Sequence, residues 1–160
     1  MRRGRTVLTA VAAVVTVAAL VVVVAGQIWL HGQRAQDRRE RAIRDAAETA
    51  VTAVLSYDYR SLDTNLASTR PLLTGDARKQ YDDVSKPLLA TAPGIHAITK
   101  AQVKTTTVLQ SGENSARVLL FVDQLSSSTR LKTPQVDQSR IVVTVSRSGG
   151  RWLVSSLSAV

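Results

Sequence analysis

The sequence predicts an α+β protein, with an N-terminal transmembrane helix followed by helices that pack on a curved, four-stranded antiparallel sheet. Residues 7–30 contain no charged side chain. Residues 34–92 repeat apolar positions at steps of three and four, the period of a helix, whereas residues 98–157 mostly alternate between apolar and polar. Because helices precede strands along the chain, we expect the helices to lie on one face of the sheet.

The apolar segment of residues 7–30 is long enough to cross a membrane. As a helix it would span roughly 36 Å, against a hydrocarbon core of ~30 Å. It is also longer than the roughly 7–15 apolar residues of a secretory signal, so we expect an uncleaved signal anchor. The alternative is a cleaved signal peptide, for which Val23-Val24-Ala25 offers a small-residue cleavage site.

Basic and aromatic residues flank this segment, namely Arg2, Arg3, Arg5, Trp29 and Arg34. We expect the basic tail, residues 1–6, to lie in the cytoplasm, because long downstream domains are translocated largely regardless of their charge. Residues 31–40 would then form a juxtamembrane stalk, and residues 41–160 an extracytoplasmic domain. The protein is thus expected to be a single-pass protein of the cell membrane.

The composition limits the chemistry of the domain. The 160 residues carry a net charge of +9 and include no cysteine, which excludes disulfides, thiol catalysis and thiolate metal sites. Five arginines lie between residues 34 and 44. They are typical of a solvated helix face near lipid headgroups. They do not indicate a nucleic-acid partner, because no recognition motif or interleaved aromatic residue accompanies them.

Three helices are predicted in the first half of the domain, over residues 34–56, 62–69 and 75–92. The first repeats apolar residues along one face, at Ile43, Ala47, Ala50, Val51, Val54 and Leu55. Tyr57-Asp58-Tyr59 ends it. Ser61 and Thr74 are the expected N-caps of the other two helices. Pro87 lies inside the third helix and should kink or divide it.

Four strands are predicted in the second half, over residues 98–109, 116–125, 140–146 and 151–157. Turn sequences at residues 111–114 and 148–150 predict hairpins between the first and second strands and between the third and fourth. Residues 126–138 are polar and include Pro134. We expect them to form a long exposed loop.

No residue pattern points to catalysis. His31 falls at the membrane boundary, and His96 has no second histidine or carboxylate at ligand spacing. Asp82 and Asp83 are adjacent, so on a helix they point in different directions. Asp58 lies between two tyrosines and is interpreted as a turn-stabilising carboxylate; a general base in a cone-shaped pocket is the alternative. We therefore expect no catalytic, cofactor or metal site.

Three segments resemble Mce-associated membrane proteins, where Mce abbreviates mammalian cell entry. They are Leu55–Asp63 (LSYDYRSLD), Leu72–Gly75 (LLTG) and Gln80-Tyr81. The closing strand, Arg151 to Val154 (RWLV), is also similar to the end of that family. The residues that form this structural signature are Tyr57, Asp58, Tyr59, Leu62 and Trp152.

The resemblance implies an NTF2-like or cystatin-like domain behind one transmembrane helix. It also implies an accessory role in the envelope lipid import systems of mycolic-acid-bearing actinobacteria, in which Mce proteins carry lipids or sterols towards a permease. The expected protein is a non-enzymatic subunit that assembles or stabilises such a complex. Its expected partners are the membrane, Mce-type transporter proteins and lipid; no cofactor is expected, and the oligomeric state stays open.

Two alternatives remain. The first is a membrane-anchored scaffold subunit of a conjugation or type IV secretion apparatus, because such systems use domains of similar architecture. The second is a lipid-binding NTF2-like module, whose cone would be lined by Tyr57, Tyr81, Val103, Leu119 and Trp152. Gene neighbourhood would separate a transporter subunit from a secretion subunit.

The anchor makes a direct prediction about the mature protein. N-terminal sequencing of protein extracted from membranes should read residues that precede the apolar segment, because an uncleaved anchor keeps its basic tail. A mature start near Gly26 would contradict the anchor and support a cleaved signal peptide.

Overall fold

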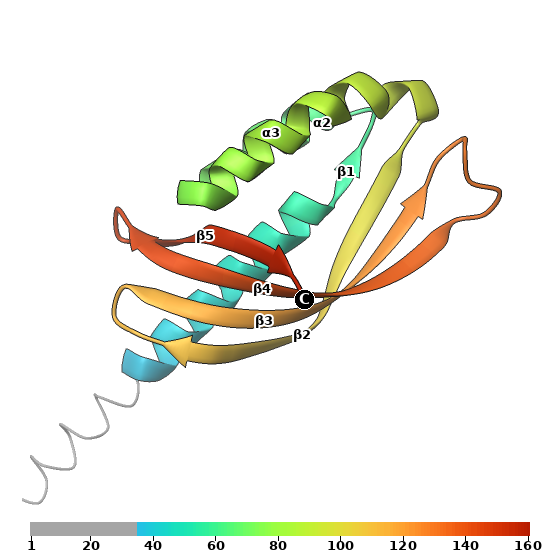
Figure 1. Ribbon diagram of the computed structural model, residues 1–160. Helices are drawn as coiled ribbons and strands as arrows, with labels where there is room; N and C mark the ends of the chain where they lie inside the picture. Colours follow the sequence, from blue (N-terminus) through green and yellow to red (C-terminus); the bar gives the residue numbers. More distant parts are fainter. Residues whose placement is uncertain (1–34) are drawn as a thin grey trace, which may run out of the picture. The chain divides into compact units, whose positions relative to one another are not determined.

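The computed structural model describes residues 35–160 (Figure 1). The predicted tail, the predicted anchor and residues 31–34 of the predicted stalk lie outside the described residues. Between residues 35 and 160, no helix is both long and apolar enough to span a membrane. The chain divides into two units, Met1–Arg39 and Glu40–Val160. The second unit is the domain described below.

A long helix is described over residues 35–55, in agreement with the predicted range, and the domain starts within it at Glu40. Its apolar face is fully buried at Ile43, Ala47 and Val51, whose side chains are all 0% exposed. These residues recur at steps of four, so they form one stripe of the helix surface. This stripe packs against the main hydrophobic core of the domain.

A short strand follows this helix, contrary to expectation. Residues Tyr57–Asp58 form β1, which pairs antiparallel with β2 through Tyr57↔Thr99 and Asp58↔Ile98. The sheet therefore has five strands, ordered β1-β2-β3-β4-β5, and the prediction of four was wrong. Two residues are too few to show an alternating pattern, and their pairing partner lies about forty residues along the chain, so periodicity could not reveal this strand.

Two further helices follow, joined by a 3-10 turn. They are α2 (Leu62–Thr69), η1 (Arg70–Leu72) and α3 (Gly75–Thr91), followed by a second 3-10 turn, η2 (Pro93–Ile95). Ser61 and Thr74 occupy the N-cap positions, as predicted, but neither side chain makes a capping hydrogen bond. Pro87 does not divide α3. The buried side chains of Ala77 and Tyr81 hold this helix against the rest of the domain, which offsets the cost of the proline.

Long antiparallel strands make up the second half of the domain: β2 (Ile98–Ser111), β3 (Ser115–Ser127), β4 (Gln135–Ser148) and β5 (Arg151–Ala159). The predicted loop over residues 126–138 was too long, because β3 and β4 continue into it and pair up to Ser126↔Gln135. Backbone pairing does not require apolar side chains, so these polar strand ends carried no signal in the sequence.

The helices pack on one face of the curved sheet (Figure 1). β-bulges after Val103 and Val108 locally bend β2. The core is formed where β3 and β4 face the helices, by side chains that alternate along each strand. These side chains are Ala116, Val118, Leu120, Val122, Ile141, Val143 and Val145. A second, smaller cluster of Leu62, Ala92 and Ala97 lies where α2 meets η2 and β2.

Replacing Leu120 tests this core. Leu120 is 0% exposed, so Leu120→Ala should lower the free energy of unfolding by about 2–5 kcal/mol through lost burial and a cavity. Equilibrium urea unfolding followed by circular dichroism would measure it. The matched control is Leu109→Ala, at a side chain 51% exposed, which should change the value by no more than about 0.5 kcal/mol. Equal losses of stability in the two variants would contradict the placement of Leu120 in the core.

Candidate functional site

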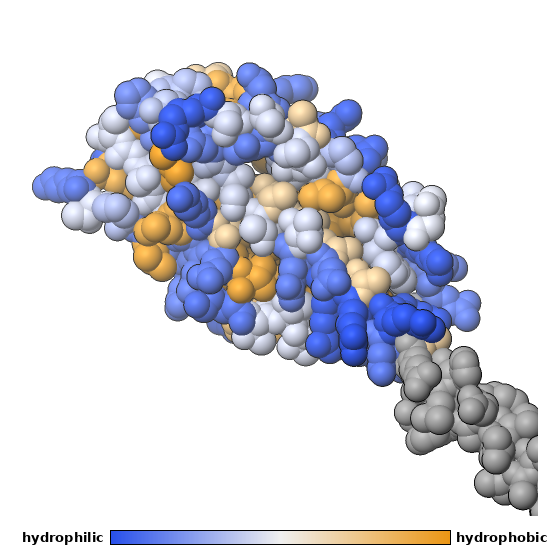
Figure 2. Space-filling model, turned by 180° about the vertical axis from the view of Figure 1, so that it is seen from behind, coloured by the Kyte–Doolittle hydropathy of each residue, from blue (hydrophilic) through white to orange (hydrophobic). Residues whose placement is uncertain are grey.

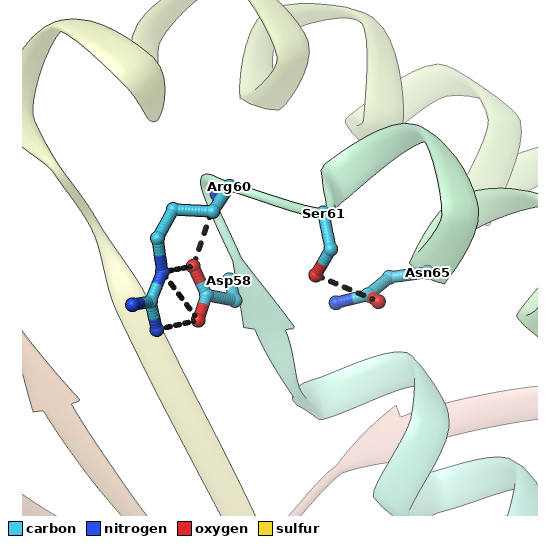
Figure 3. A network of polar contacts seen from close by, with 4 residues as sticks. All are labelled: Asp58, Arg60, Ser61 and Asn65. Carbon is cyan, nitrogen blue, oxygen red and sulfur yellow. Dashed lines mark hydrogen bonds and ion pairs between the residues drawn. The ribbon is translucent and has the colours of Figure 1, made fainter.

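The Tyr57-Asp58-Tyr59 signature leads from β1 into a tight turn that is stabilised by an ion pair (Figure 3). Asp58 Oδ1 accepts hydrogen bonds from Arg60 N at 3.0 Å and from Arg60 Nε at 2.9 Å, while Oδ2 accepts one from Arg60 Nη2. The Asp58 carbonyl accepts a further bond from Ser61 N at 3.0 Å. The Asp58 side chain thus caps the turn that leads from β1 into α2.

This ion pair determines the acidity of Asp58. Hydrogen bonds from the Arg60 side chain and backbone are the main reason why the pKa of Asp58 falls from 3.8 to about 2; the charges of Arg60 and Lys100 act in the same direction, and desolvation acts against it. A general base works best with a pKa near the operating pH. An aspartate held this acidic is stable as an anion and is a weak proton acceptor, so its environment suits a structural carboxylate.

The two tyrosines of the signature pack against the small core cluster. The Tyr59 ring stacks on His96, with ring centroids 4.7 Å apart, and Arg60 lies over the same tyrosine ring at 5.9 Å. His96 has a positive φ of 49° and links η2 to β2. The signature residues of this segment therefore join β1, α2 and the start of β2 into one corner of the domain.

Trp152, the fifth residue of the signature, lies elsewhere. It belongs to β5 and is partly buried against the main core. Leu62 is 4% exposed and lies in the small cluster with the tyrosines. The fold thus brings four of the five signature residues together and leaves Trp152 in a separate packing role.

The five residues expected to line one cone do not share a cavity within residues 35–160. Val103 lines an open groove beside the first helix, whereas Tyr81 lines a separate apolar hollow of about 160 Å³. Leu119 lies between the buried Val118 and Leu120 on β3, so it points to the sheet face away from the helices. Tyr57 packs on the small cluster and Trp152 on the main core.

Packing explains why this cone is not formed. The buried stripe of the first helix packs in one core with Ala77 and Tyr81 of α3 and with the inward side chains of β3 and β4. The apolar hollow that remains, at about 160 Å³, is below the roughly 300–1,000 Å³ of ligand pockets. Burial raises the pKa of the Tyr81 hydroxyl that borders it. The hollow is therefore smaller than a typical ligand pocket.

A larger groove was not anticipated from the sequence. It measures about 660 Å³ and runs between the first helix, α2 and β2, with mostly small and hydroxyl side chains. Thr49, Thr52 and Ser56 line it, and Ser56 Oγ accepts a hydrogen bond from Ala101 N at 2.9 Å. In the sequence, these hydroxyl residues recur at steps of three and four on the polar face of the helix, and this spacing could have indicated the groove.

Within residues 35–160, no group of three or more His, Cys, Asp or Glu side chains is placed to hold a metal ion. On the face seen in Figure 2, hydrophobic side chains gather in several patches that are separated by hydrophilic ones.

The Asp58–Arg60 pair predicts a pH dependence. Because the folded pKa lies below the unfolded value of 3.8, the ionised carboxylate stabilises the fold above pH 3.8, and this contribution is lost as pH falls towards about 2. In carboxyl-carbon NMR titrations, Arg60→Gln should return the pKa of Asp58 towards 3.8. Lys100→Gln is the matched control: it removes a charge that affects Asp58 less, so it should raise the pKa of Asp58 less than Arg60→Gln does. An unchanged pKa in Arg60→Gln would contradict the pairing.

Solved structures of similar fold come from several classes of protein. The periplasmic domain of DotI matches with a TM-score of 0.64 at 14% identity, covering 75% of this chain and 94% of that one. CagV of Helicobacter pylori, a VirB8 homolog of a type IV secretion system, matches at 0.58 and 9%, covering 74% and 96%. A putative scytalone dehydratase of Novosphingobium aromaticivorans matches at 0.59 and 15%, covering 80% and 88%. These similarities show that the fold is NTF2-like and VirB8-like, and they do not show a function.

Relatives by sequence come from Mycobacterium tuberculosis. "Uncharacterized protein Rv1362c" is 31% identical over 139 residues, which cover 82% of this chain but only 63% of that protein's length. "Outer membrane protein Rv1973" is 30% identical over 125 residues, which cover 76% of each chain. A family model described as "Uncharacterized protein Rv1363c/MT1408-like" matches residues 5–160. The chain therefore belongs to the Rv1363c/MT1408-like family.

Proposed function

We propose that this protein is a non-enzymatic assembly subunit of an Mce-type lipid or sterol import complex, held at the outer side of the cell membrane. The observation that carries the proposal is an unpaired sheet edge. β5 pairs with β4 only as far as Ile141↔Ala159, so residues 135–139 of β4 pair with β3 alone. β4 continues past the C-terminal end of β5 (Figure 1).

This edge suits the binding of an extended segment from another protein. Val136 is 63% exposed and lies opposite Leu125, which is 45% exposed, so an apolar pair lies beside free backbone groups. Unpaired strand edges accept partner strands through main-chain hydrogen bonds, and side-chain contacts then select the partner. The proposed partner is an extended segment of an Mce-type transporter protein.

Three observations support an accessory role in the envelope. The signature segment resembles Mce-associated membrane proteins. One relative is named an outer membrane protein, and the similar DotI structure is a periplasmic domain. The signature carboxylate is bound by Arg60 within its own turn, which supports a structural part for Asp58 instead of a catalytic one.

The alternatives make different demands. A lipid-binding module needs an apolar cavity, whereas the groove of about 660 Å³ has a lining of threonine, serine and other polar residues around a few small apolar ones. A secretion scaffold would use the same fold and could use the same edge. It differs in its partners, which makes the identity of co-purifying proteins the deciding measurement.

Co-purification tests the proposal. Tagged full-length protein, extracted from native membranes, should retain Mce-type transporter components. Val136→Asp should reduce their recovery by at least about tenfold, because a charge would be buried at the contact. The matched control is Val84→Asp on α3, a valine 60% exposed, which should retain them.

Two outcomes would contradict the proposal. Recovery of secretion components in place of transporter components would favour the scaffold. Equal recovery with Val136→Asp and with the unchanged protein would show that this edge is not the contact.

A further inference from the structure

A second polar feature, an arginine-lined hollow, lies where α2, η1, α3 and β5 meet. It measures about 500 Å³, and its lining residues are Ala67, Arg70, Pro71, Arg78 and Arg151. It shares no residue with the groove beside the first helix or with the free edge of β4. Three of its five lining residues are arginines, and each comes from a different element: η1, α3 or β5.

Main-chain contacts bring these arginines together. Thr74 N donates a hydrogen bond to Val154 O at 2.8 Å, and Leu73 forms a parallel bridge with Val154. This clamp attaches the segment between η1 and α3 to β5. Because the clamp is made by backbone groups, it holds Arg78 and Arg151 at the same hollow whatever their side-chain charges are.

The positive charge of the hollow is only partly neutralised. Arg70 donates hydrogen bonds from Nε and Nη2 to the two carboxylate oxygens of Asp82, at 2.9 and 3.0 Å. Within residues 35–160, Arg78 and Arg151 make no ion pair. Three cations and one anion leave a local charge of +2.

Arg78 is the least satisfied of the three. Its Nε is buried and has no hydrogen-bond partner in the described part of the chain. The residue also follows the first turn of α3, where the helix dipole favours an anion over a cation. A buried donor without an acceptor and a convergence of like charges both cost free energy. A bound anion would relieve the convergence of like charges.

We infer that this hollow binds a phosphate-class oxyanion, either a phospholipid headgroup or a soluble phosphate ester. Guanidinium groups donate paired hydrogen bonds that match phosphate oxygens. A phosphate group presents several acceptor oxygens to arginines that approach from different sides, and its negative charge offsets the local +2. A single carboxylate offers two oxygens and one charge. The inference does not depend on the proposed transporter role.

Binding measurements on the full-length chain in a non-ionic detergent would test this inference. The three probes are inorganic phosphate, dihexanoyl phosphatidylglycerol and zwitterionic dihexanoyl phosphatidylcholine as the lipid control. We expect binding of phosphate, of phosphatidylglycerol or of both, with phosphatidylcholine weaker. Binding of phosphate alone would assign a soluble ligand, and binding of phosphatidylglycerol alone a lipid headgroup.

Variants connect the binding to the hollow. Arg78→Gln with Arg151→Gln should weaken binding at least about tenfold, because two charge-assisted contacts are lost. Arg151→Gln alone, at an exposed residue, should weaken it in the same direction without a change in the circular dichroism spectrum. The matched control is Arg147→Gln, in the same hairpin but outside the hollow, which should bind as the unchanged protein does.

Any of three results would overturn the inference: no binding of either anionic probe, undiminished binding in the double variant, or a loss in Arg147→Gln equal to that in the double variant. If both phosphate probes fail but hexaglutamate binds and depends on Arg78 and Arg151, the inference is also overturned, because the hollow would then recognise an acidic protein segment. None of these results bears on the edge of β4, so failure here leaves the proposed assembly role to its own test.

Discussion

The contact between the first helix and the centre of the sheet is the interaction on which the rest of the structure depends. Ile43, Ala47 and Val51 have no exposed surface, and neither do Val118 and Val143 of the strands that face the helices. Full burial of an aliphatic side chain of this size stabilises a fold by about 1.5–3 kcal/mol. The alanines of the stripe, Ala47 and Ala50, present little side-chain bulk towards the sheet.

This packing also decides where binding can occur. The buried stripe of the first helix packs in one core with α3 and the inward side chains of the strands. The larger openings are the groove beside α2, a hollow of about 590 Å³ along β3 and β4, and the arginine hollow at η1. A well-packed interior therefore directs the functional hypotheses towards surface recognition, whether of a partner strand or of an anion.

Two sets of charged residues in the domain differ in how their charges are balanced. Asp58 and Arg60 satisfy one another within three residues of sequence, and this local pair holds the turn after β1. Arg78 and Arg151 are brought to one hollow by long-range contacts and form no ion pair within residues 35–160. A self-contained pair stabilises structure, whereas unpaired charges that converge are better explained by a ligand.

Local patterns in the sequence were sufficient for much of the fold. The three- and four-residue spacing in the first helix, the N-cap positions before α2 and α3 and the hairpin turns at residues 111–114 and 148–150 all appear in the structure. Each depends on a property of neighbouring residues: side-chain period, backbone conformation or turn geometry. The interpretation of Asp58 as a turn residue has the same local basis.

Tertiary contacts decided the remaining features. Strand β1 exists only because Tyr57 meets Thr99, the ends of β3 and β4 exist because polar residues pair through their backbones, and Leu119 faces away from the helices because its neighbours are buried. The arginine hollow depends on the backbone clamp between Thr74 and Val154, eighty residues apart. The sequence by itself determined the elements and their amphipathic faces, since these follow from near neighbours; only the folded chain decided which distant residues share a site.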